Sequence, residues 1–105
     1  MPIHNNPHPT LNKTWNQWLN RFLDYERGGR QASKHTLRAY TKDLELFFQH
    51  VQDADVDDVQ HISKFHIRSF LSLLYEKGHA TSTMKRRLSC LRSFFRYLMR
   101  FEILT

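Results

Sequence analysis

Basic residues crowd the last part of the chain, in a pattern that suits contact with a polyanion. Residues 80–105 contain six lysine or arginine residues and one acid, Glu102, so this segment carries +5 of the chain's net charge of +6. Placed on a helix at 100° per residue, the segment has an apolar face and a separate basic face without acids. Nucleic acid is the first candidate partner for such a helix. The apolar face comprises Met84, Leu88, Leu91, Phe95 and Leu98, and the basic face comprises Lys85, Arg86, Ser89, Arg92, Ser93, Arg96 and Arg100.

Two further groups of residues could extend this basic face. Three hydroxyl residues open the same expected helix, where free backbone N–H groups suit phosphate oxygens, although ordinary helix capping would explain them as well. A second basic arc lies on an earlier expected helix, with Glu45 at its far edge. Alone, this arc is typical of a plain surface, but two basic helices could straddle one groove of DNA. The candidate DNA-binding residues are Lys34, His35, Arg38, Lys42, Thr81, Ser82, Thr83, Lys85, Arg86, Ser89, Arg92 and Arg96.

No residue of this chain is expected to be catalytic. The sequence contains no glycine-rich phosphate loop, nucleophile elbow or metal-binding signature. Its seven histidines are scattered without acids or cysteines at ligand spacing, so we expect neither a metal nor a cofactor. The single cysteine, Cys90, is expected to be a buried structural thiol. A lone cysteine and the absence of a signal peptide favour a cytoplasmic protein.

The hydrophobic pattern predicts an all-α fold, a compact domain of four helices over residues 13–105 behind a flexible leader, residues 1–12. The expected N-terminal caps are Asn12 or Thr14, then Ser33 and Ser63, while the last helix begins near Thr81 and runs to about Phe101. Gly28-Gly29 and Gly78 are the expected stops. An acidic connector separates the second and third helices. The aromatic residues expected in the core are Trp15, Trp18, Phe22, Phe47, Phe48, Phe70 and Phe95, while Cys90, Tyr97 and Phe101 lie on the flank of the last helix and are expected to contact protein.

Three ordered motifs resemble one known family. Residues 33–47 read S-x-x-T-L-x-x-Y-x-x-D-L-x-x-F, and Ile67-x-x-Phe70-Leu71 and Gly78 follow. The basic run from Met84 to Leu98 completes the set. Together these motifs resemble the N-terminal SAM-like, or core-binding, domain of tyrosine recombinases of the phage integrase type, most closely the Xer recombinases. The resemblance covers residues 12–105.

This resemblance implies a division of labour. In the family, the helical domain clamps one side of duplex DNA through its second and fourth helices, which enter the major groove. A C-terminal domain, expected to lie beyond Thr105, supplies the catalytic groups and a tyrosine that bonds to a 3′-phosphate. None of Tyr25, Tyr40, Tyr75 and Tyr97 matches that nucleophile's motif. Sister recombinase protomers on DNA are the implied partners, and the isolated fragment is expected to be a monomer.

Two other functions remain open from the residues alone. The basic face could meet an acidic protein, which would make this a helical protein-interaction module. A free-standing DNA-binding regulator would need its own dimer interface to read a two-fold operator, and no strong candidate for that interface occurs in the sequence.

Overall fold

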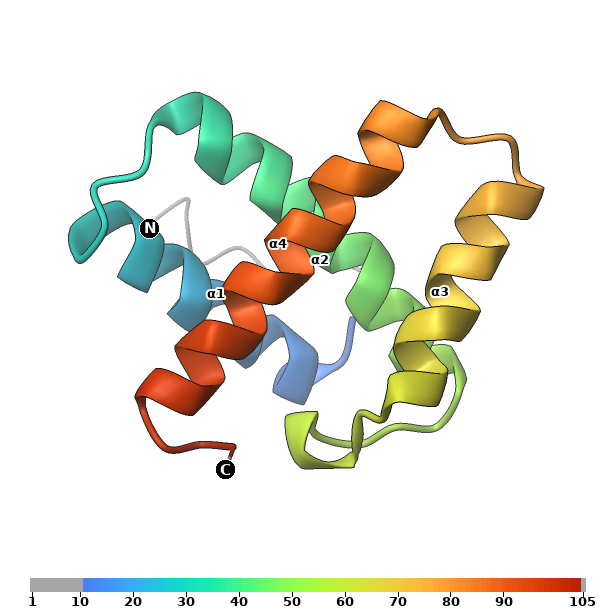
Figure 1. The fold of residues 1–105 in the computed structure, drawn as a ribbon. Coiled ribbons are helices and arrows are strands. Elements are labelled where there is room, and N and C mark those ends of the chain that lie inside the picture. Colours follow the sequence, from blue (N-terminus) through green and yellow to red (C-terminus); the bar gives the residue numbers. More distant parts are fainter. Residues whose placement is uncertain (1–10, 105) are drawn as a thin grey trace. The chain divides into compact units, whose positions relative to one another are not determined.

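The computed structural model of the protein describes residues 11–104 and consists of helices joined by short connections. The four α-helices are α1 (Lys13–Gly28), α2 (Lys34–Asp53), α3 (Lys64–Glu76) and α4 (Thr81–Arg100), with a short 3-10 helix, η2 (Val59–His61), before α3 (Figure 1). No strand occurs between residues 11 and 104. The predicted all-α fold with four helices is therefore confirmed, while residues 1–10 of the expected leader lie outside the described residues. The chain forms two compact units, one ending at Asp57 and the other beginning at Asp58.

The first unit is a pair of helices held together by aromatic side chains. The ring centroids of Trp15 and Phe48 lie 5.0 Å apart, and those of Phe22 and Tyr40 lie 6.0 Å apart. The indole N–H of Trp15 donates to the carbonyl oxygen of Val56 at 3.2 Å, so this fully buried ring leaves no orphaned donor. The contacts of Trp15 fix the start of α1 against the end of α2, and the contact of Phe22 with Tyr40 joins the second half of α1 to the first half of α2.

Local capping explains where the helices begin. The side chain of Asn12 accepts a hydrogen bond from the backbone N–H of Trp15 at 3.1 Å, and that of Ser33 accepts one from Thr36 at 3.1 Å. Ser63 precedes α3, and its backbone N–H donates to Nδ1 of His66 at 2.9 Å. Because each cap satisfies N–H groups that have no partner inside the helix, the predicted starts at Asn12, Ser33 and Ser63 are confirmed.

Gly78 makes the turn that places the start of α4. Its φ angle is +79°, a conformation that costs little only for glycine. The backbone N–H of Gly78 donates to Tyr75 at 3.0 Å, and that of His79 donates to Leu74 at 3.1 Å. This pair of bonds is a Schellman motif, which satisfies the last carbonyl groups of α3 and allows α4 to begin three residues later, at Thr81.

The buried face of α4 differs from the predicted one. The residues that this helix buries are Arg87, Cys90, Leu91, Phe94, Tyr97 and Leu98. Met84, Leu88 and Phe95, which were expected inside, are only half-buried. At 100° per residue the true buried face is rotated by roughly 80° from the predicted one. The predicted face was wrong because it left out Phe94, placed Cys90 and Tyr97 on the flank, and counted Arg87 only as a cation. The long aliphatic stem of an arginine can be buried while its charged end finds a partner.

The other predicted core positions are largely correct. Five of the seven expected aromatic residues are buried, whereas Trp18 and Phe95 are half-exposed. The guanidinium carbon of Arg21 lies 4.4 Å from the ring centre of Trp18, which covers part of that ring. Cys90 is fully buried, as expected of a structural thiol, and Tyr97 is buried, but Phe101 is 52% exposed. Among the described residues, no helix has both the length and the apolar character needed to cross a membrane.

The rotation of α4 predicts unequal effects for two leucines. Leu91 is 2% exposed, so Leu91→Ala should leave a cavity and lower the free energy of unfolding by about 2–5 kcal/mol. Leu88 is half-buried, so Leu88→Ala should cost about 1 kcal/mol. Chemical denaturation of the two variants measures both values. Equal losses would favour the face that the sequence predicted over the observed one.

Glu26 should make stability depend on pH. Burial raises the pKa of Glu26 above its usual value, and the charge of Arg30, whose Nε lies 3.3 Å from Oε2, opposes this more weakly. The Glu26 carboxyl group therefore holds its proton more tightly in the folded chain than in the unfolded chain. Its protonation adds to the free energy of unfolding at low pH, and this contribution is lost as the pH rises through the raised pKa. Glu26→Gln cannot titrate, so its Tm relative to the parent should increase from about pH 4 to about pH 8. A pH-independent difference in Tm would show that Glu26 is not desolvated.

Candidate nucleic-acid interface

One side of α4 is a stripe of exposed cations. Lys85, Ser89, Arg92, Arg96 and Arg100 are exposed and follow the spacing i, i+4, i+7, i+11, i+15, which places them along one line of the helix. Exposed Arg86 lies beside this line. These six residues are named the α4 basic stripe. It runs for about 22 Å at a rise of 1.5 Å per residue.

The helix that carries the stripe has no acid of its own from Thr81 to Arg100, whereas solvated helices normally mix both signs of charge. Within the part of the chain that the structure describes, Lys85, Arg92 and Arg96 make no ion pair. In α1, by contrast, the guanidinium of Arg27 lies 2.8 Å from the carboxylate of Asp24. Like charges along one helix repel each other, so an anionic partner would relieve a cost that the free protein bears.

Arg87 is not part of the stripe, although it lies within the same basic run. It is 9% exposed, on the buried face of α4, and its Nη1 lies 3.3 Å from Nδ1 of His79. An arginine can only donate hydrogen bonds, so Nδ1 of His79 is the acceptor in this contact. Five of the six cations of α4 are therefore exposed to solvent, while the sixth, Arg87, contacts His79 in the connection between α3 and α4.

The first turn of α4 is open to an anion. Its N-cap is Ala80, which has no side chain to bond the free backbone N–H groups. Thr81 and Ser82 are exposed and Thr83 is half-exposed in the first helical positions. Ordinary capping, the alternative explanation for these hydroxyl residues, is not their role here, because none of the three is the N-cap. The end of the helix dipole and three hydroxyl groups lie together there.

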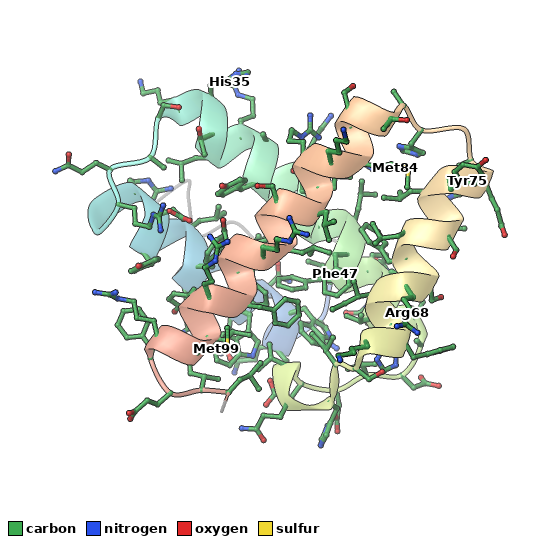
Figure 2. The ribbon with its side chains drawn as sticks, viewed as in Figure 1. His35, Phe47, Arg68, Tyr75, Met84 and Met99 are labelled. Carbon is green, nitrogen blue, oxygen red and sulfur yellow. The ribbon has the colours of Figure 1, made fainter. Side chains whose placement is uncertain are left out.

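The basic arc of α2 is also exposed. Lys34, His35, Arg38 and Lys42 all face solvent, whereas Leu44 is buried. Figure 2 shows His35 projecting outward from the first turn of α2, whereas Phe47 of the same helix is fully buried. All twelve residues that the sequence singled out are thus exposed, except half-exposed Thr83, and they form one group on each unit.

The outer face of α3 carries exposed cations that are not among the predicted DNA-binding residues. Lys64 and Arg68 are exposed one turn apart on this helix, and Tyr75, 74% exposed, points outward near its end (Figure 2). The i, i+4 spacing of the two cations was a readable signal, but it was weaker than the longer run in α4. Between residues 11 and 104, the structure brings together no three His, Cys, Asp or Glu side chains that could hold a metal ion.

Comparisons with known proteins agree with the motifs. The chain matches the family described as phage integrase, N-terminal SAM-like domain, over residues 19–102. The tyrosine recombinase XerC of Halalkalibacterium halodurans is 36% identical over 84 residues, which are 80% of this chain and 28% of that protein. XerC of Azotobacter vinelandii is 37% identical over 82 residues, 78% of this chain and 27% of that protein.

A third relative, XerC of Listeria innocua, is 34% identical over 85 residues, which are 81% of this chain and 28% of the relative. This chain therefore spans less than a third of the length of these recombinases. No solved structure matches the chain significantly. The match over residues 19–102 includes every motif on which the resemblance was based, so the chain belongs to the family of phage integrase N-terminal SAM-like domains.

Proposed function

We propose that this chain is the duplex-DNA-binding domain of a site-specific tyrosine recombinase, which holds one half-site of a recombination target for a catalytic domain. The observation that carries this proposal is the α4 basic stripe, an exposed line of cations on a helix that contains no acid of its own from Thr81 to Arg100. The names of the XerC relatives, which are tyrosine recombinases, support the assignment to recombination.

The length of α4 suggests which of its residues contact bases and which contact phosphates. The major groove of B-DNA is about 12 Å wide, and the stripe from Lys85 to Arg100 is about 22 Å long, so a helix crossing the groove cannot place all of it there. We place the first three turns in the groove, because they also contain the open helix N-terminus. Arg86, Ser89 and Arg92 would then reach base edges, while Thr81, Ser82 and Thr83 would hold phosphates.

The remaining residues would grip the backbone. The exposed arc on α2, Lys34, His35, Arg38 and Lys42, would add phosphate contacts from the first unit, and Lys85 and Arg96 would do so from the second. Residues 13–105 would thus form the binding domain, with chemistry supplied by a catalytic domain outside this chain and with sister protomers on the DNA. We expect the isolated chain to be a monomer and the recombinase to act in the cytoplasm.

The first prediction concerns the strength of binding. The chain should bind duplex DNA weakly and with little sequence preference, with a Kd of roughly a micromolar or more at physiological salt. Because binding releases counterions from phosphates, log Kd should rise linearly with log salt concentration. Titration of a labelled duplex at several salt concentrations measures the slope. A salt-independent Kd, or no binding at low salt, would rule the proposal out.

The second prediction ranks residues of one type on one helix. Arg92→Ala should weaken DNA binding by about 1–3 kcal/mol if it reaches a base, or lower the salt slope by about one if it reaches phosphate. Arg38→Ala on α2 should weaken binding by less. Arg100→Ala is the matched control, because Arg100 lies on the same stripe but two turns beyond Arg92, and it should be nearly silent.

Affinity measurements at one fixed salt concentration compare these variants. Equal losses for Arg92→Ala and Arg100→Ala would indicate a diffuse electrostatic patch, and the docked helix would then have to be abandoned. Thermal melting of each variant excludes unfolding as the cause of a loss.

A further inference from the structure

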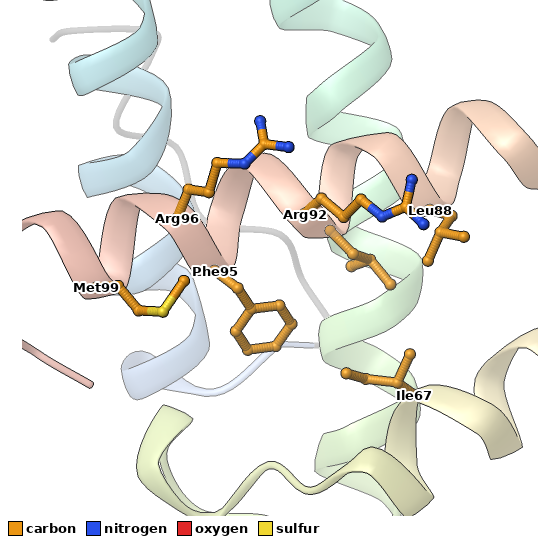
Figure 3. A pocket seen from close by; sticks show the side chains of 7 residues that line it. Ile67, Leu88, Arg92, Phe95, Arg96 and Met99 are labelled. Atoms are coloured by element: carbon orange, nitrogen blue, oxygen red, sulfur yellow. The ribbon is translucent and has the colours of Figure 1, made fainter. Parts of the chain in front are cut away.

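An apolar groove lies in the second unit, beside the α4 basic stripe. Ile67 of α3 and Leu88, Phe95 and Met99 of α4 form its walls, and Leu91 forms its floor. Its volume is about 250 Å³. Figure 3 shows Phe95 and Met99 on the side of α4 toward Ile67, whereas Arg96 points to the other side and Arg92 extends along the helix toward Leu88.

The walls of this groove are large hydrophobic side chains that the second unit does not fully bury. Ile67, Leu88 and Phe95 are half-buried and Met99 is 53% exposed. Single exposed apolar residues are common, but four that converge on one hollow indicate an interaction site. The hollow is smaller than the roughly 300–1,000 Å³ of typical small-molecule pockets, so side chains of a protein partner fit it better than a free ligand.

The positive charge beside the groove indicates a partner with acidic residues. Arg92 and Arg96 line one edge of the hollow, and neither makes an ion pair in the described part of the chain. The α3 wall belongs to a helix whose exposed cations, Lys64 and Arg68, have no acid between them. We propose that the groove between α3 and α4 binds an amphipathic helix of another protein, with apolar anchors that enter the hollow and acidic residues that pair with Arg92 and Arg96.

The dimensions of the groove set the pattern of that helix. Leu88 and Met99 are eleven positions apart on α4, which corresponds to about 16 Å, or three turns of a helix lying alongside. Four anchors at i, i+4, i+7 and i+11 span the same eleven positions and would fill this length, extending the pattern of other complexes that seat a helix in a groove. This proposal goes beyond DNA binding, and its test contains no DNA.

The test uses a synthetic peptide of defined sequence. An 18-residue helical peptide, roughly five turns long, would carry leucines at i, i+4, i+7 and i+11 and glutamates on both flanks of that line. The control peptide has the same composition in scrambled order, so that attraction to the basic stripe alone is the same for both. The 15N-labelled chain, titrated with the patterned peptide, should show amide shifts centred on Ile67, Leu88, Phe95 and Met99.

Matched variants locate the site. Leu88→Ala should weaken peptide binding about tenfold, whereas Leu46→Ala, which removes a 44% exposed leucine from α2, should leave it unchanged. Met99→Gln, at an exposed position where folding is not at risk, should also weaken binding. The proposal would be overturned if both peptides bound equally well, or if the amide shifts mapped elsewhere. It would also be overturned if the Leu88→Ala and Met99→Gln variants bound the patterned peptide as well as the parent does. Sedimentation showing a dimer that Met99→Gln dissociates would also overturn it, because a second copy would then occupy the groove.

Discussion

The orientation of α4 about its own axis is the constraint on which the surface of this protein depends. Leu91, Phe94 and Leu98 are 2% exposed or less, and a buried arginine, Arg87, lies on the same face. Apolar burial of this size resists rotation of the helix, because turning it would expose these side chains and bury cations of the stripe without partners. This orientation of α4 leaves the cationic stripe on one side of the helix and a half-buried apolar strip on the other.

The boundaries of the helices matter for the same reason, because they determine which residues begin α4. The turn at Gly78 closes α3, and the next helix starts on Ala80, a residue that cannot cap it through a side chain. The free N–H groups of that first turn therefore stay open to an external acceptor. Arg87, four residues beyond Thr83, holds His79 and so connects the buried face of α4 to this turn. A structural arginine thus supports the end of the helix proposed to meet phosphate.

Much of the fold was readable from local patterns, while the exact faces of α4 were not. The caps at Asn12, Ser33 and Ser63 and the stop at Gly78 depend on residues within one turn, so the sequence predicted them correctly. The rotation of α4 depends on tertiary packing, which decides whether an arginine stem, a thiol and a phenol are buried. The exposed cations were nevertheless identified, because Arg92 and Arg96 lie far enough from the true buried face that an error of roughly 80° leaves them outside. The groove was missed because its walls were assigned to the core.

The central claim is that α4 meets duplex DNA through the first three turns of its cationic stripe. The most direct test maps the amide shifts of the 15N-labelled chain while it is titrated with a short duplex. The account predicts that the largest shifts fall on residues 81–92, with a second, smaller group at the start of α2, and that Arg100 and the exposed arginines of α1, Arg21 and Arg27, stay near their free positions. Shifts spread evenly over all exposed lysines and arginines would contradict it, because they would describe a basic protein that attracts DNA without a docked helix.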